Sequence, residues 1–195
     1  MKNKKENKKH IKKFQKARFD FAKYVREFYV ENGKAYISVK VDSINDIISE
    51  YSIKGSEWLN RDFVVYVEEN TYYIPVIYPI VIDIYGCNFT EEQQKMITEV
   101  IRDYFGLKLG DKILELKQNR KKAVMLLLFG ITTLVISLLL SSFDDTSMLF
   151  QVIVIVSWFA IWEFVSYVWF EREQMNRDKL EAGQLASMEV KFNNK

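Results

Sequence analysis

The chain has very little of the residue chemistry on which many enzymes and metal sites depend. Its 195 residues include one cysteine, Cys87, and one histidine, His10. A single cysteine excludes an intrachain disulfide and any zinc site built from several cysteines. The sequence also lacks a phosphate-binding glycine loop, an HExxH motif and a GxSxG motif. We therefore expect a non-enzymatic protein with no cofactor and no bound metal.

Charge is missing from two long stretches, and this absence is the most informative one. Residues 123–143 are 21 positions without a charged side chain, and residues 148–170 are 23 positions in which only Glu163 is charged. A helix needs about 20 apolar residues to cross a bilayer core of ~30 Å. The sequence therefore predicts two membrane-spanning helices, joined by a turn over residues 142–146.

Positive charges lie at one end of this predicted hairpin. The basic residues that flank the spans are Lys117, Arg120, Lys121, Lys122, Arg172, Arg177 and Lys179, whereas the turn carries only Asp144 and Asp145. Cytoplasmic flanks are the ones enriched in Lys and Arg. Residues 1–30 lack the apolar core of a signal peptide. We expect a protein of the bacterial cytoplasmic membrane with both termini in the cytoplasm.

The total charge of +2 hides a basic amino-terminal arm. Residues 1–27 hold nine Lys and two Arg against three acidic residues, a local charge of +8. We expect residues 1–32 to be partly disordered, with an amphipathic helix whose basic and aromatic side chains contact anionic lipid headgroups. The residues expected at the membrane surface are Lys12, Lys13, Lys16, Lys23, Phe14 and Phe21. The alternative is a helix packed on its own domain with solvated lysines. We do not expect nucleic acid as a partner, because a basic arm alone is a weak signal.

Residues 33–110 carry the alternating patterns of a small cytoplasmic α+β domain. Apolar and polar residues alternate over 35–41 and 80–85, which predicts two strands. Residues 62–68 fit either a strand or a buried helix. The segment 72–79 contains both prolines of the chain, so we expect it at a sheet edge or in an extended connection.

Two capping patterns predict helix starts in this domain. Ser43 with Asp46 predicts a short helix that reaches Tyr51, and Thr90 with Gln93 predicts a longer one. Gly106 has the position of a glycine that ends the longer helix. A linker helix is then expected to start at residue 111 and run into the first span.

The end of the chain is expected to return to the domain. A charged helix should follow the second span and stop at Gly183, and Met188, Val190 and Phe192 alternate with polar residues as in a strand. The predicted divisions are the arm 1–32, the α+β domain 33–110, the linker helix and hairpin 111–182, and a returning strand within 183–195. The fold class is an α+β membrane protein.

This order of elements includes one distinctive stretch, Trp158-Phe-Ala-Ile-Trp162-Glu163. With that stretch the chain resembles an uncharacterised bacterial family of two-span membrane proteins with a small cytoplasmic α+β domain. The resemblance extends roughly over residues 34–192. It implies the architecture described above and adds no function.

Glu163 is the one charged residue within the predicted spans. Counting back from Phe170 places it about 10 Å inside the boundary, level with Gly130 on the first span. The other small or polar candidates are Gly130, Thr132, Thr133 and Ser137. Intramembrane ionisable residues usually face a partner or water. Three interpretations remain open: an interfacial Glu163 beside an aromatic belt, a structural hydrogen bond to Thr133, and an ion-related role.

The leading hypothesis is a membrane anchor whose cytoplasmic domain recruits or senses a protein partner. The first alternative is a homo-oligomeric channel or membrane-disrupting effector that uses Glu163. A channel would have to contain several copies of the chain, because the two spans of one chain cannot enclose a conduit. The second alternative is a membrane-bound enzyme that acts on lipid or nucleotide. That enzyme would need polar residues that converge in a pocket of the domain.

Overall fold

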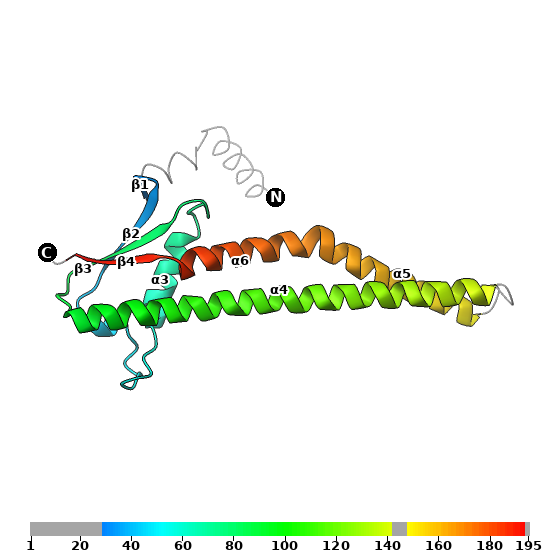
Figure 1. The fold of residues 1–195 in the computed structure, drawn as a ribbon, viewed down its shortest axis with the longest axis horizontal. Helices are drawn as coiled ribbons and strands as arrows, with labels where there is room; N and C mark the ends of the chain where they lie inside the picture. Colours follow the sequence, from blue (N-terminus) through cyan, green and yellow to red (C-terminus); the bar gives the residue numbers. More distant parts are fainter. Residues whose placement is uncertain (1–28, 142–147, 194–195) are drawn as a thin grey trace, which may run out of the picture. The chain divides into compact units, whose positions relative to one another are not determined.

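The computed structural model describes residues 29–141 and 148–193 and has mixed α and β structure (Figure 1). It divides into two compact units. The sheet unit comprises Met1–Thr98 together with Met188–Lys195, and the hairpin unit comprises Glu99–Ser187. The basic arm, the turn with Asp144 and Asp145, and the membrane-surface residues proposed on the arm lie outside the described residues.

The sheet unit is built on four strands in the order β1-β2-β3-β4. These are β1 (Val30–Glu31), β2 (Lys34–Lys40), β3 (Ile80–Tyr85) and β4 (Glu189–Asn193). The β1–β2 pair is antiparallel, and β2–β3 and β3–β4 are parallel. The strands expected over 35–41, over 80–85 and near the carboxyl terminus are present, and the last one pairs with β3.

The connection from β2 to β3 answers the open question over residues 62–68. This segment lies in the helix α3 (Arg61–Thr71). Asn60 caps the start of this helix, because its side chain accepts a hydrogen bond from the Asp62 amide. The buried residues Phe63, Val64, Val67 and Thr71 recur at helical spacing. The two prolines lie in the connection to β3, which forms turns instead of the expected sheet edge or extended segment: the Tyr78 amide donates to the Pro75 carbonyl.

The helix expected from Ser43 to Tyr51 is wrong in length. Only a single 3-10 turn, Ile44–Asp46, forms there. The Asp46 carboxylate accepts hydrogen bonds from the backbone amides of Ser43 and Asp42, and these bonds hold the pKa of Asp46 below its ordinary value. The capping pattern was therefore correct, but the following residues enter a loop.

The predicted helix end at Gly106 is also wrong. Helix α4 runs unbroken from Glu91 to Ser141, through both Gly106 and Gly110. Its start is as expected, since the Thr90 amide donates to Gln93 Oε1 and the Gln93 amide donates to Thr90 Oγ1. A glycine inside a helix costs only about 1 kcal/mol, which is too little to stop a helix of 51 residues.

The rest of the hairpin unit is a nearly continuous second helix. It consists of α5 (Met148–Ser166), the π-helical turn η2 (Tyr167–Glu171) and α6 (Arg172–Ala186). The expected stop at Gly183 falls three residues too early, because α6 includes this glycine. Both long helices contain stretches that are long and apolar enough to cross a membrane.

Candidate functional site

The two long helices of the hairpin unit meet at a seam of small residues. A side chain at Gly130 would bring its Cβ to 2.8 Å from Ile161 Cγ1, 3.1 Å from the Ser157 carbonyl oxygen and 3.2 Å from Ala160 Cβ. Helices that pack in lipid use such small residues because these let two backbones approach closely. Gly130 is therefore a packing position.

Hydroxyl groups line the same seam. The Ser157 hydroxyl donates to the Thr133 hydroxyl over 2.8 Å, and Ser157 itself is fully buried. Ser137 is also buried and donates to the carbonyl of Leu134 in its own helix. Thr132 differs, because it is exposed and donates only to the Leu128 carbonyl. Three of the four candidates on the first apolar stretch thus face the seam.

Glu163 lies elsewhere, toward the charged end of the hairpin unit. It lines a pocket of about 30 Å³ together with residues of α4 and of η2. The complete lining is Asn119, Lys122, Ala123, Leu126, Glu163, Tyr167 and Glu171. Sequence analysis placed Glu163 level with Gly130, and this is incorrect. Gly130 packs against Ser157 and Ile161 and does not line the pocket. Thr133 bonds to Ser157 and does not line the pocket.

The π-helical turn accounts for which residues share this pocket. In an α-helix, two residues eight apart point about 80° away from each other around the axis. A π-helical turn winds less per residue, because each hydrogen bond spans five residues. Here the Arg172 amide donates to the Tyr167 carbonyl. The slower winding brings Glu171 back toward the face that carries Glu163 and Tyr167.

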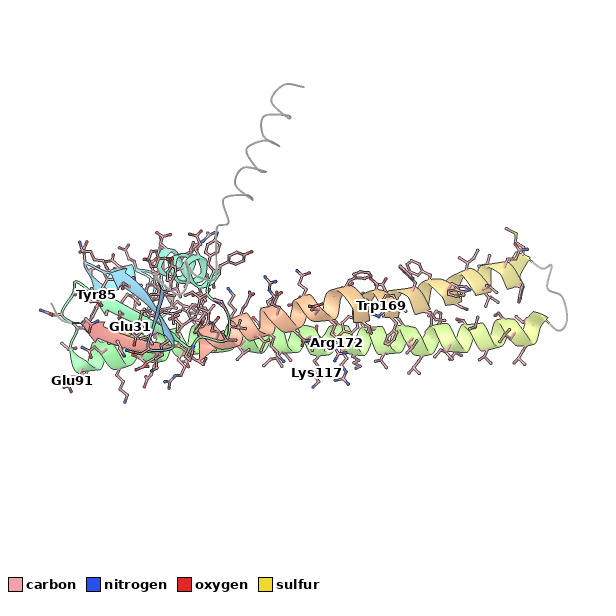
Figure 2. The ribbon with its side chains drawn as sticks, turned by 90° about the horizontal axis from the view of Figure 1, so that it is seen from above. Glu31, Tyr85, Glu91, Lys117, Trp169 and Arg172 are labelled. Carbon is pink, nitrogen blue, oxygen red and sulfur yellow. The ribbon has the colours of Figure 1, made fainter. Side chains whose placement is uncertain are left out.

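Aromatic and basic side chains mark the same level of the hairpin unit. Trp162, Trp169 and Phe170 are exposed. Figure 2 shows Arg172 near the level of Lys117 on the other helix, and Trp169 farther along the hairpin, away from Glu91. Tryptophan at the edge of an apolar stretch, followed by Lys and Arg, is typical of a membrane–water interface on the cytoplasmic side.

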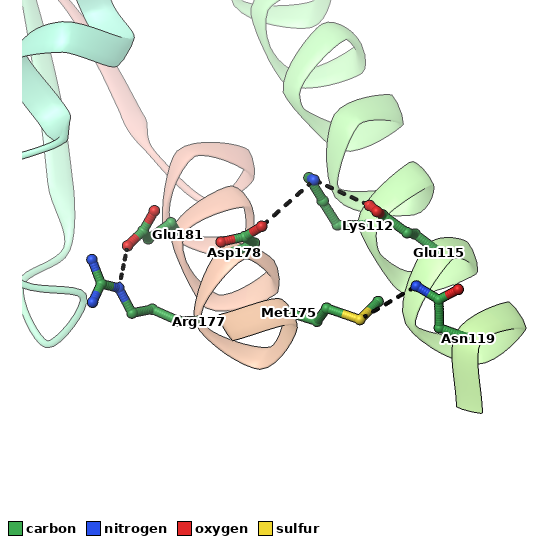
Figure 3. Close-up of polar contacts among 7 residues, drawn as sticks. All are labelled: Lys112, Glu115, Asn119, Met175, Arg177, Asp178 and Glu181. Carbon is green, nitrogen blue, oxygen red and sulfur yellow. Dashed lines mark hydrogen bonds and ion pairs between the residues drawn. The ribbon is translucent and has the colours of Figure 1, made fainter. Parts of the chain in front are cut away.

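Beyond this level, polar contacts join α4 to α6 (Figure 3). Lys112 Nζ lies 3.1 Å from Glu115 and 3.7 Å from Asp178, and the Glu115 hydrogen bond is the main reason that the pKa of Lys112 is raised. Asn119 Nδ2 approaches Met175 Sδ at 3.5 Å. We call this part, residues 99–122 with 172–186, the stalk.

The sheet unit has its own candidate surface, which the sequence analysis missed. Residues 49–58, here called the aromatic loop, expose Tyr51, Ile53 and Trp58 at 97%, 73% and 56%. The loop is ordered by its own hydrogen bonds, from the Ser49 amide to the Trp58 carbonyl and from the Trp58 amide to the Ser52 hydroxyl. The available signal was three large apolar residues in a segment with no apolar periodicity.

Among the described residues, no group of three or more His, Cys, Asp or Glu side chains is placed to hold a metal ion. Cys87 is half-buried in the sheet unit. The Glu163 pocket and the aromatic loop are therefore the two candidate sites.

Comparison with known proteins gives no further guidance. No family model, no curated protein and no solved structure matches the chain.

Proposed function

We propose that the chain is a membrane anchor that holds its sheet unit in the cytoplasm, where the aromatic loop recruits a protein partner. In this proposal α4 and α5 cross the cytoplasmic membrane of a bacterium, and both termini are cytoplasmic. The observation that carries the proposal is the aromatic loop. Large apolar side chains held in water by an ordered loop are typical of interaction sites.

The charge of the sheet unit indicates the kind of partner. Its described residues include twelve acidic and six basic side chains, a net charge of −6. Glu50 and Glu57 belong to the aromatic loop, against one basic residue, Lys54. A protein groove with an apolar floor and a basic rim would complement the exposed apolar side chains and the acidic excess of the aromatic loop.

A pore built from several copies has weaker support. That alternative needs polar residues on the outer face of the hairpin, where they could meet a neighbouring copy. Gly130, Ser137 and Thr133 are instead engaged within the seam of one hairpin. Thr132 is the only exposed member of the four candidates in the part of the chain that the structure describes.

The enzyme alternative also has weak support. Polar groups do converge in one pocket, but that pocket lies in the hairpin unit and holds one lysine and two glutamates. Its lining contains no Ser, Thr, Cys or His, so it cannot form a Ser–His or Cys–His pair.

Site-specific photocrosslinking in intact cells tests the recruitment proposal. A photoreactive amino acid at Ile53 should give one dominant adduct with another protein, and the Trp58→Ser substitution should abolish it. The same probe at Glu69, an exposed position of α3, is the matched control. Equal adducts at the two positions, or adducts only with lipid or with a second copy of the chain, would contradict recruitment through this loop.

A further inference from the structure

The polar groups of the Glu163 pocket converge without bonding to one another. Glu163, Glu171 and Lys122 have no ion pair or hydrogen bond within residues 29–141 and 148–193. Tyr167 is more than nine-tenths buried, and its hydroxyl has no hydrogen-bond partner in these segments either. Glu163 is half-buried and Tyr167 is buried, so leaving these two groups without a partner costs free energy. A ligand that bonds to them would remove this cost.

The charge of the pocket favours a cation. Two carboxylates and one ammonium group give the lining a formal charge of −1. Asn119 and Tyr167 add neutral oxygens. Carboxylates bind ammonium groups through charge-assisted hydrogen bonds, which are roughly twice as strong as neutral ones. They attract monovalent metal ions through charge.

The size of the pocket limits that cation to a compact one. The cavity volume is about 30 Å³. One water molecule needs ~10–15 Å³ of such a cavity. A primary ammonium group or a desolvated monovalent ion fits, whereas the three methyl groups of a choline head require more room.

We infer that this pocket binds a compact monovalent cationic group between Glu163 and Glu171. Two sources share this chemistry, the primary ammonium of an aminophospholipid headgroup and a free monovalent ion. Lys122 and Glu171 are exposed, so the mouth of the pocket reaches the surface. For a lipid, the Lys122 ammonium would hold the phosphate next to the bound headgroup ammonium. The lipid source rests on the membrane location in the proposed function.

Thermal unfolding of the purified full chain in nonionic detergent tests the inference. The probes are methylammonium, sodium, potassium and tetramethylammonium chlorides at one ionic strength, and short-chain phosphatidylethanolamine against phosphatidylcholine. A ligand that binds only the folded state raises the melting temperature in proportion to its occupancy. Glu163→Gln and Glu171→Gln should each weaken the response about tenfold or more. Glu173→Gln, an exposed α6 position outside the lining, should not.

The outcomes separate the two sources. Stabilisation by methylammonium and phosphatidylethanolamine, but not by tetramethylammonium or phosphatidylcholine, would identify the lipid headgroup ammonium as the ligand of the pocket. Lys122→Gln should then weaken only the stabilisation by phosphatidylethanolamine. The stabilisation by methylammonium should stay unchanged. Stabilisation by sodium or potassium, with no preference for phosphatidylethanolamine, would establish the free ion.

One result would overturn the inference. Equal responses to methylammonium and tetramethylammonium, or responses that persist in both glutamine variants, would mean that the pocket does not select a compact cation. Because Glu171 is exposed, its glutamine variant remains informative if Glu163→Gln does not fold. The assay needs neither the aromatic loop nor a protein partner, so its failure and a failed crosslink at Ile53 are distinguishable.

Discussion

The Ser157 hydroxyl donates a hydrogen bond of 2.8 Å to the Thr133 hydroxyl, and this bond joins α5 to α4 at the centre of the seam. Ser157 is fully buried, so water is not an alternative partner for its hydroxyl. Hydrogen bonds between apolar helices in lipid contribute about 0.6 kcal/mol on average and up to ~2 kcal/mol. The bond therefore fixes the register of the hairpin more than it adds stability.

The first prediction concerns two adjacent threonines. Thr133→Val removes the hydroxyl that bonds to Ser157 and should lower the unfolding free energy of the hairpin by about 0.5–2 kcal/mol. Thr132→Val is the matched control, because Thr132 is exposed and bonds only to its own helix. Unfolding in mixed detergent micelles, followed by circular dichroism, measures both. Equal effects would contradict the assigned register.

The second prediction compares two glycines of α4. Gly130→Val should destabilise the hairpin by about 1–3 kcal/mol, because even its Cβ would lie within 3.2 Å of three atoms of α5. Gly110→Ala should instead stabilise α4 by roughly 0.5–1 kcal/mol, because nothing lies within 4 Å of the added Cβ. Opposite shifts in melting temperature are expected, and shifts of the same sign would show that the seam is not at Gly130.

The third prediction concerns pH and the strand that closes the sheet. Lys34 Nζ lies 2.7 Å from Glu189 Oε2, so this pair links β2 to β4 across the sheet. The Lys34 hydrogen bond lowers the pKa of Glu189 below its ordinary value of 4.5, and the Glu189 hydrogen bond raises the pKa of Lys34 above 10.5.

The direction of the pH effect follows from these shifts. A carboxyl with a lowered pKa stabilises the fold above its ordinary pKa of 4.5 and loses this contribution as the pH falls through the lowered value. Lys34→Gln should therefore speed amide exchange in β4 at neutral pH but not in strong acid. The change should be no more than a few-fold, because both side chains are about half exposed and water screens them. A difference that persists in strong acid would exclude the ion pair as its cause.

The fourth prediction concerns Asp83 on the central strand β3. Asp83 is buried, and its Oδ1 has no hydrogen-bond partner among the described residues. Its neighbours in register are Ser38 and Lys191. Asp83→Val should raise the unfolding free energy by roughly 1 kcal/mol or more, because it removes a buried polar group without a partner. Glu69→Gln is the exposed control, and a destabilised Asp83→Val variant would reveal an interaction of the carboxylate with Lys191.

Local patterns predicted those elements that depend on local physics. Alternation located β2, β3 and β4, and the spacing of Thr90 and Gln93 located the start of α4. Residues 62–68 stayed ambiguous because a short run of valines fits a strand and a buried helix equally well. The stop at Gly106 failed because glycine propensity is a weak term in a long helix.

The candidate sites depend on relationships that no local pattern encodes. The sequence singled out Glu163, but its neighbours follow from the register between two helices and from a π-helical turn. A count from the expected span ends placed Glu163 level with Gly130, whereas its pocket is lined by α4 residues between Asn119 and Leu126. The aromatic loop was assigned as a loop, yet only the folded chain shows that Tyr51, Ile53 and Trp58 remain exposed.

The membrane anchor is the central claim, and thiol labelling of single-cysteine variants in intact cells tests it most directly. Cys87 is the only cysteine, so Cys87→Ser gives a background for Asp144→Cys in the turn or Ser56→Cys in the aromatic loop. A membrane-impermeant maleimide should label the first variant in intact cells and the second only after permeabilisation. Labelling of both or of neither in intact cells would contradict a two-span anchor with a cytoplasmic sheet unit.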